Sequence, residues 1–276
     1  MVFGSARRSL GILVLGFNRP ALLQLVLKSL KQQSALPLVR VWIDGTSGRQ
    51  SLQSDVDACR EIASRYPVAE IRAHAGHLGI ERLMLDGLTH MAQLYDRILV
   101  LEDDCIPTLN AVELFSDMLE QTKSHNDIFS VYGHWFMVPA EGTTITRFQG
   151  WGWAAHGKRL RPVLAEVKRL FDLDERDYLT ETRKRLTPAV LARLDVTPGR
   201  NVIAVLEAFF SWDSCTSLVT AERGLLHART AKRTIYNCGM GIGGGHFDRH
   251  AIFRAPPFNM VLPEEVGRIV GLAEQA

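Results

Sequence analysis

Three consecutive acidic residues, Glu102, Asp103 and Asp104, directly follow the apolar segment 99–101. An acidic group at the carboxyl end of a strand lies where α/β sheets bind ligands. Carboxylate oxygens are the ligands that hard divalent cations take in proteins, often together with substrate phosphates. A solvated turn or a helix N-cap is the alternative interpretation of such a triplet. The apolar strand before the triplet and the segment 105–108 after it favour a metal site.

The pattern around the triplet predicts an α/β sheet that positions it. Apolar segments alternate with amphipathic ones through short loops, which is typical of a mostly parallel sheet covered on both faces. Pro20 suits the first turn of a helix, where its missing N–H costs nothing. The predicted strands are 11–16, 39–43, 68–72 and 97–101. One predicted helix begins at Pro20, and two others span about 54–65 and 80–94.

The second half of the chain is less regular. Residues 129–132 have the composition of a strand. The stretch 158–200 has a helical pattern and is basic, with 11 Lys or Arg against 7 Asp or Glu. A glycine-rich loop at 239–245 precedes His246. Glycine density of this kind suits a loop that closes over a ligand and reopens.

Composition and charge limit the classes of protein that the chain can belong to. Its 276 residues are 46% apolar, which suits a large globular domain and excludes wholesale disorder. A formal charge of +2 gives no reason to expect nucleic acid as a partner. The early apolar stretch 10–17 is too short to span a membrane, so we expect at most peripheral membrane contact. The four cysteines form no CxxC pair, which favours a reducing cytoplasm.

Several motifs in a fixed order carry a resemblance to a known family: 16–20, 42–45, 77–82, 99–104, 150–153, 209–214 and 239–248. Through these motifs the chain resembles glycosyltransferases of the GT-A fold, over about residues 10–250. It is most similar to the metal-dependent inverting N-acetylglucosaminyltransferase I type and its bacterial relatives. The resemblance implies that Asp104 ligates Mn²⁺, or Mg²⁺, between the diphosphate oxygens of a nucleoside-diphosphate sugar. It also implies that Glu102 and Asp103 lie near the ribose and the sugar.

The resemblance assigns four further residues to the nucleotide. The turn with Asn18 and Arg19 contacts it in the family, although an acidic residue is common there where Asn18 stands, which leaves the identity of the base open. Asp44 is similar to a strand-end Asp that contacts the base, with an ordinary Asp-Gly turn as the alternative. Arg82 suits bidentate pairing with a diphosphate, and a surface arginine on a helix is its alternative.

On the acceptor side, the resemblance assigns Asp213 as the catalytic base, which takes the proton from the attacking hydroxyl. Trp151 and Trp153 belong to a segment at the junction of donor and acceptor sites, and at least one of them is expected in the core. In the family the Trp-Asp element follows this segment closely, whereas 60 residues separate Trp153 from Asp213 here. We interpret residues 158–207 as a helical insertion that shapes the acceptor side.

The glycine-rich loop is similar to a mobile loop that orders over the donor in the family. His246 in this loop would either complete the metal shell or contact the diphosphate, and both alternatives stay open. A dinucleotide-binding loop is excluded, because no strong strand precedes the glycines.

These observations predict a single domain at 9–263, with a nucleotide-sugar half at 9–107, an acceptor half at 108–263 and a C-terminal tail at 264–276. The expected partners are a nucleoside-diphosphate sugar donor, UDP-linked by resemblance, and a glycan or glycoconjugate acceptor. A sugar nucleotidyltransferase is one alternative, although no glycine-rich loop bearing Arg and Lys follows the first strand. A catalytically silent carbohydrate- or nucleotide-binding module is the other.

Overall fold

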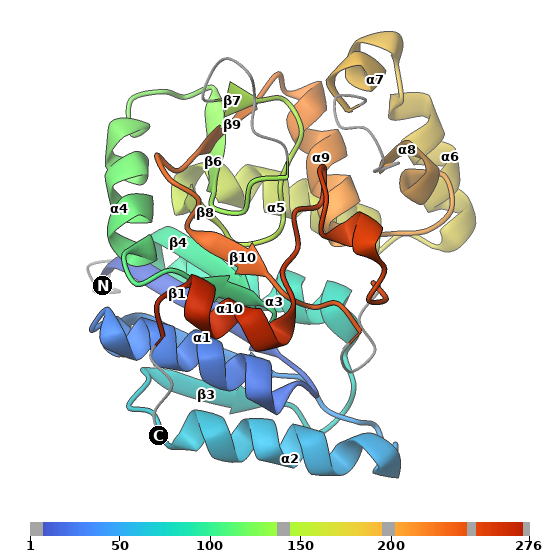
Figure 1. Ribbon diagram of the computed structural model, residues 1–276. Helices are drawn as coiled ribbons and strands as arrows, with labels where there is room; N and C mark the ends of the chain where they lie inside the picture. Colours follow the sequence, from blue (N-terminus) through green and yellow to red (C-terminus); the bar gives the residue numbers. More distant parts are fainter. Residues whose placement is uncertain (1–7, 137–143, 195–201, 242–246, 273–276) are drawn as a thin grey trace, which may run out of the picture.

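An eight-stranded sheet runs through the centre of the computed structural model (Figure 1), which describes residues 8–136, 144–194, 202–241 and 247–272. Its strands are β1 (Arg8–Gly16), β2 (Val39–Ile43), β3 (Glu70–Ala73), β4 (Tyr95–Glu102), β6 (Ile128–Tyr132), β7 (Thr144–Ile145), β8 (Trp153–His156) and β9 (Leu226–Arg229). They lie in the order β3-β2-β1-β4-β8-β6-β9-β7. The pairs from β3 to β4 are all parallel, β8 is antiparallel to both of its neighbours, β9 is parallel to β6 and β7 is antiparallel to β9.

Helices cover both faces of this sheet (Figure 1), because its side chains alternate between two apolar clusters. On β1, Ile12 and Val14 point into one cluster, whereas Leu13 and Leu15 point into the other. The first cluster is covered by α1 (Pro20–Gln32), α2 (Gln50–Ser64), α4 (Ala111–Gln121) and α10 (Pro263–Ile269). The second is covered by α3 (Gly79–Leu94), α5 (Gly157–Phe171), α6 (Glu175–Arg185), α7 (Pro188–Leu194), α8 (Val202–Leu206) and α9 (Trp212–Glu222).

The register of the parallel strands brings separate loops to one edge of the sheet. Leu15 of β1 lies opposite Trp42 of β2 and opposite Glu102 of β4. The chain therefore leaves all three strands at the same level, and the loops that follow them meet at the carboxyl edge. A two-stranded antiparallel sheet of β5 (Cys105–Pro107) and β10 (Ile235–Asn237) extends this edge. It brings the segment after Asn237 next to the acidic triplet.

The predicted α/β/α sandwich with a mostly parallel sheet is confirmed. Helix α1 begins at Pro20 as expected, whereas α2 begins at Gln50, ahead of the predicted 54, because its first turn is polar and shows no apolar periodicity. The predicted insertion is helical in α5 to α8. Within the described residues, no helix is both long enough and apolar enough to cross a membrane.

Residues 264–272, which the sequence analysis placed in a C-terminal tail, contribute to the core. Most of them lie in α10, and Val266, Val270 and Leu272 are buried in the cluster that also contains α1. Val266 and Val270 are four residues apart, which is about one helix turn, and Leu272 lies just beyond the end of α10. The chain is thus packed against the sheet beyond the predicted boundary at 263.

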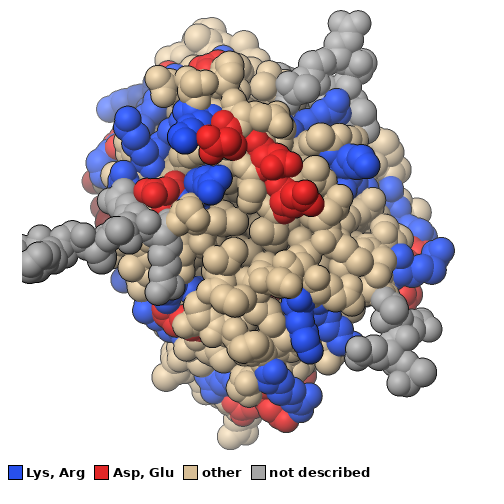
Figure 2. Space-filling view, turned by 90° about the vertical axis from the view of Figure 1, so that its left-hand side faces the viewer, with Lys and Arg blue, Asp and Glu red and all other residues tan. Residues whose placement is uncertain are grey.

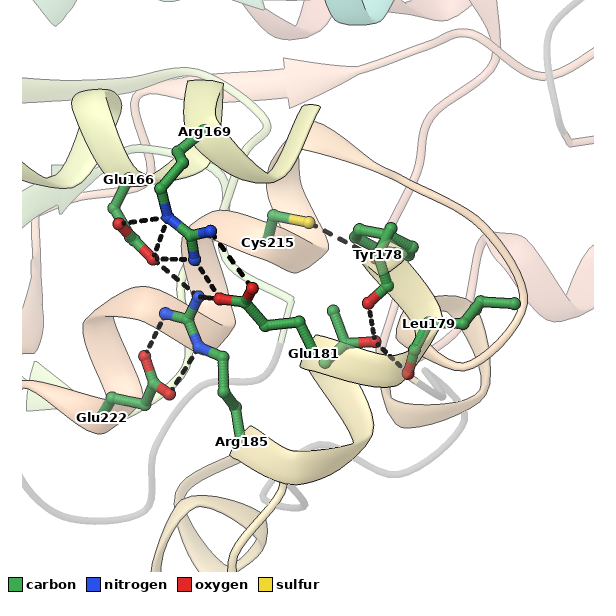
Figure 3. A network of polar contacts seen from close by, with 9 residues as sticks. Glu166, Arg169, Tyr178, Leu179, Glu181, Arg185, Cys215 and Glu222 are labelled. Atoms are coloured by element: carbon green, nitrogen blue, oxygen red, sulfur yellow. Dashed lines mark hydrogen bonds and ion pairs between the residues drawn. The ribbon is translucent and has the colours of Figure 1, made fainter. Parts of the chain in front are cut away.

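An ion network fastens α5 and α6 of the insertion to α9 (Figure 3). Arg185 donates from Nη1 to Glu166 at 2.7 Å and from Nε to Glu222 at 2.7 Å. Arg169 pairs with Glu166 at 2.9 Å and also with Glu181. Hydrogen bonds from Arg169 are the main reason that the pKa of Glu166 and that of Glu181 are lowered. The network therefore stabilises the fold above the ordinary carboxyl pKa and loses this effect as the pH falls through the lowered values.

We expect Arg185→Met to reduce the free energy of unfolding at pH 7 by about 1–3 kcal/mol, because three glutamates lose their shared partner. Lys184→Met, an exposed neighbour on the same helix, is the control and should change stability by less than about 0.5 kcal/mol. Urea denaturation followed by circular dichroism measures both. The difference in the free energy of unfolding between Arg185→Met and wild type should become smaller below about pH 4. Equal stability of the two variants at pH 7 would contradict this role of the network.

Candidate functional site

A cavity of about 720 Å³ opens at the carboxyl ends of β1, β2 and β4. Its walls come from the turn after β1, the loop after β2, the first turn of α3, the end of β4 and the segment after β10. Six of the residues singled out in the sequence line it together: Asn18, Arg19, Asp44, Glu102, Asp103 and Asp104. Sequence-distant segments therefore bring these side chains to one place.

The guanidinium of Arg19 lies between two carboxylates of the triplet. Its Nη1 donates to Asp104 Oδ2 at 2.8 Å, and its Nη2 forms an ion pair with Asp103. Burial lowers the pKa of Arg19, but the neighbouring carboxylates outweigh this and raise that pKa above its ordinary value. Arg19 is therefore charged at every physiological pH and provides a built-in cation for the site.

The surroundings of Glu102 and Asp103 oppose the ionisation of these two side chains. Burial raises the pKa of Asp103 to about 6, although Arg19 acts in the opposite direction. Burial and then the charge of Asp104 raise the pKa of Glu102 well above its usual range. Because like charges and burial both disfavour the ionised forms, a further cation entering the cavity would favour them.

The segment after β10 closes around Asp104. Asn237 Nδ2 donates to Asp104 Oδ1 at 3.3 Å, and the backbone N–H of Gly239 donates to the side-chain oxygen of Asn237 at 3.0 Å. A Cβ added to Gly239 would lie 2.2 Å from Asp104 Oδ2 and 3.1 Å from Arg19 Nη1. Only glycine fits at this position, because any side chain would displace the carboxylate of Asp104 or the guanidinium of Arg19.

Asp44 also lines the cavity and caps helix α3. Its Oδ1 accepts from Leu78 N at 2.7 Å, its Oδ2 accepts from Gly79 N at 3.0 Å, and His77 Nδ1 lies 2.7 Å from Oδ2. The ring of His77 packs on that of Phe17 with centroids 5.2 Å apart. Asp44 thus fixes the loop that carries His77, and its contact with a base stays a prediction.

Two of the candidate site residues that the structure describes, Arg82 and Asp213, are not among those lining the cavity. Arg82 lies on the outside of α3, half-exposed, with Nε 3.7 Å from Asp86 and its guanidinium over the ring of Phe171. The structure does not bring Arg82 to the cavity. His246 lies outside the described residues, as does the centre of the glycine-rich loop.

Asp213 lies in the first turn of α9, next to the wall of the cavity. Its Oδ1 accepts from Ser214 N at 2.7 Å and from the Ser211 hydroxyl. A Cβ added to Gly150 would lie 3.5 Å from Asp213 Cβ, so the backbone that leads into the cavity-lining Trp151 packs against this turn. The role of Asp213 as a base stays a prediction.

The two tryptophans of the glycine and tryptophan segment have different surroundings. Trp153 is buried in the core and stacks on Trp212 with ring centroids 6.3 Å apart, which confirms the expectation that at least one of the pair is a core residue. Trp151 lines the cavity, with the ring of Phe247 at 5.4 Å. The cavity is therefore lined by a second pair of aromatic side chains, Trp151 and Phe247, besides Phe17 and His77.

Glu81 is a cavity residue that the sequence analysis did not select. Its Oε2 accepts from Trp212 N at 2.6 Å. Burial, with a contribution from the charge of Asp213, raises the pKa of Glu81 to about 7. The sequence contained a signal, since Glu81 belongs to the motif 77–82, but an acid in the first turn of a helix is common for reasons of the helix dipole alone.

The residues at the cavity are compatible with a divalent cation that arrives with a diphosphate. Within the described ranges, no three His, Cys, Asp or Glu side chains converge as a ligand set. Asp104 nevertheless presents carboxylate oxygens to the cavity, and cations of this kind are often held by one or two carboxylates together with substrate phosphates. One of its oxygens is paired with Arg19 in this structure.

Comparisons with known proteins add little to this geometry. No protein-family model matches the chain, and no curated protein matches its sequence. Similar solved structures include 4-diphosphocytidyl-2C-methyl-D-erythritol synthase from Anaerococcus prevotii DSM 20548, with 12% identity and a TM-score of 0.39 over 63% of this chain and 84% of that one. TarS 1–349 of S. aureus has 10% identity and a TM-score of 0.46 over 83% of this chain and 60% of that one. Mannosyltransferase PcManGT from Pyrobaculum calidifontis, in complex with GDP-Man and Mn²⁺, has 14% identity and a TM-score of 0.43 over 79% of this chain and 70% of that one. Nothing about the activity of this chain follows from likenesses at this level.

We expect Gly239→Ala to destabilise the protein by about 1–3 kcal/mol, because the new methyl group overlaps Asp104 Oδ2 and the carboxylate can move only by giving up Arg19 or Asn237. Gly76→Ala is the control, since its added Cβ would meet Ser47 Oγ only at 3.8 Å. Denaturant unfolding of both variants at neutral pH is the measurement. If Gly239→Ala is as stable as Gly76→Ala, the close packing at Asp104 is not what the geometry indicates.

Proposed function

We propose that the protein is a glycosyltransferase of the inverting type, which transfers a sugar from a nucleoside-diphosphate sugar to a hydroxyl group of a glycan or glycoconjugate. A UDP-linked donor is proposed on the resemblance in sequence. The observation that carries the proposal is the convergence of six residues singled out in the sequence on one cavity, with the guanidinium of Arg19 between two of their carboxylates.

The dimensions and lining of the cavity support a donor of this size. Its volume of about 720 Å³ falls within the range of about 300–1,000 Å³ that small-molecule sites occupy. The pair of Phe17 and His77 would take the base by stacking, and Trp151 would pack on the sugar. The diphosphate would then lie beside Arg19 and Asp104.

In this arrangement Arg19 would pair with phosphate oxygens, which a guanidinium binds in a bidentate manner. Mn²⁺ or Mg²⁺, held by Asp104 and the diphosphate, would supply charge stabilisation of the departing diphosphate when bound. Asp213 would accept the proton of the acceptor hydroxyl as its oxygen attacks the anomeric carbon. The carbon–oxygen bond to the diphosphate breaks in the same displacement, so the configuration inverts and no covalent intermediate with the protein is required.

We expect Asp104→Asn to weaken the affinity for UDP-N-acetylglucosamine in the presence of Mn²⁺ by about tenfold or more, because the amide lacks the charge that holds the cation. Asp117→Asn, an exposed residue of α4, is the control. Calorimetric titration with and without Mn²⁺ measures the effect. Donor affinity equal to that of wild type with Mn²⁺ present would remove Asp104 from the metal site.

We expect Asp213→Asn to lower the rate of transfer by about 10²–10⁴-fold while donor affinity is retained, since an amide cannot accept the proton. Asp172→Asn, an exposed residue at the end of α5, is the control. The assay measures release of UDP in the presence of a panel of glycan acceptors. A folded Asp213→Asn protein with full transfer activity would refute the assignment of the base.

Two further measurements separate the competing functions. Release of pyrophosphate from a nucleoside triphosphate and a sugar phosphate would identify a nucleotidyltransferase instead. The wild-type protein would be a silent binding module if it bound the donor but neither transferred the sugar to any acceptor of the panel nor hydrolysed the donor in water.

A further inference from the structure

Glu81 connects the first turn of α3 to the first residue of α9. Its Oε2 accepts the hydrogen bond from Trp212 N at 2.6 Å. The first N–H groups of a helix have no acceptor within that helix, and the N-cap residue Ser211 makes no side-chain cap bond. Glu81 therefore caps α9 from a separate element, 131 residues away in the sequence.

Asp44 does the same for α3. It accepts from Leu78 N and Gly79 N, the N–H groups at the start of that helix. Two carboxylates thus link three elements in series, from the end of β2, through the first turn of α3, to the first turn of α9. Asp44 and Glu81 line the cavity, and Asp213 follows Trp212 directly at the end of this series.

The position of Glu81 is costly for a carboxylate. Its hydrogen-bond donor is a neutral N–H, and the charge of Asp213 lies close enough to disfavour its ionisation. Burial of a carboxylate with so little compensation is typical of functional sites. At the same time Trp212, whose N–H it holds, is itself fixed in the core by stacking on Trp153, so the contact sets the start of α9 at one place.

We propose that Glu81 is a positioning residue for the transfer: by holding Trp212 N it fixes the adjoining Asp213 at the wall of the cavity. This inference rests on the proposed function, because Asp213 has a proton to accept only if transfer occurs. A displacement of about 1 Å at a reacting group costs up to about 10²-fold in rate, so loss of this contact should be visible in turnover.

The test compares Glu81→Ala, which removes the acceptor, with Glu81→Gln, whose side-chain oxygen can still accept from Trp212 N. With UDP-N-acetylglucosamine and Mn²⁺, we expect Glu81→Ala to lower kcat by about 10–100-fold with a KM for the donor within about threefold of wild type. Glu81→Gln should retain kcat within about threefold. Gln93→Ala, an exposed change on the same helix, is the control.

A second measurement does not depend on activity. Hydrogen exchange of the Trp212 amide in the ligand-free protein should become faster in Glu81→Ala than in wild type, and should stay protected in Glu81→Gln. Unchanged exchange in Glu81→Ala, unchanged kcat in an active preparation, or equal losses of kcat in both variants would overturn the proposal. Altered exchange in a protein that shows no transfer at all would instead count against the proposed function.

Discussion

The ion pairs of Arg19 with Asp103 and Asp104 are the interaction on which the cavity depends. Three consecutive acids at the end of a buried strand repel one another, and burial further disfavours the charges of Glu102 and Asp103. A guanidinium placed between two of them makes this arrangement tolerable. Arg19 can take that place because β1 and β4 are parallel neighbours in register, so that the turn after one strand meets the end of the other.

The same pairing gives the site its chemical character. Arg19 holds two carboxylates of the triplet, and Asn237 at the end of β10 and Gly239 just after it pack against Asp104. A bound diphosphate would offer Arg19 new anionic partners and leave Asp104 available to a cation. On the face shown in Figure 2, basic and acidic side chains are interspersed among large uncharged areas.

The second constraint is the capping of helices at the carboxyl edge of the sheet. Asp44 and Glu81 satisfy backbone N–H groups that α3 and α9 cannot satisfy themselves. At its other end α9 is tied to the insertion by Arg185 and Glu222. The turn that carries Asp213 is therefore held by contacts at both ends of one helix, from elements that are distant in the sequence.

Much of this was predictable from local patterns. The alternation of strands and helices follows from hydrophobic period, and the triplet is recognisable because it directly follows an apolar strand. The identity of its partner depends on strand register, which the sequence does not display. Arg82 and Glu81 illustrate the limit: adjacent residues on a helix point about 100° apart, and only the packing of α9 decides that Glu81 faces the cavity while Arg82 faces outward.

The most direct test of the account is the melting temperature of the full chain with nucleoside-diphosphate sugars, in the presence and absence of Mn²⁺. Nucleoside monophosphates are the reference, since they lack the second phosphate that Arg19 and Asp104 would share with a cation. Because a ligand that binds the native state raises its stability by about 2.7 kcal/mol at 100 times its Kd, binding should be readily detected. The account predicts a rise for at least one diphosphate sugar that is larger with Mn²⁺ and larger than for its monophosphate. No rise with any diphosphate sugar, or an equal rise with the monophosphate, would contradict it.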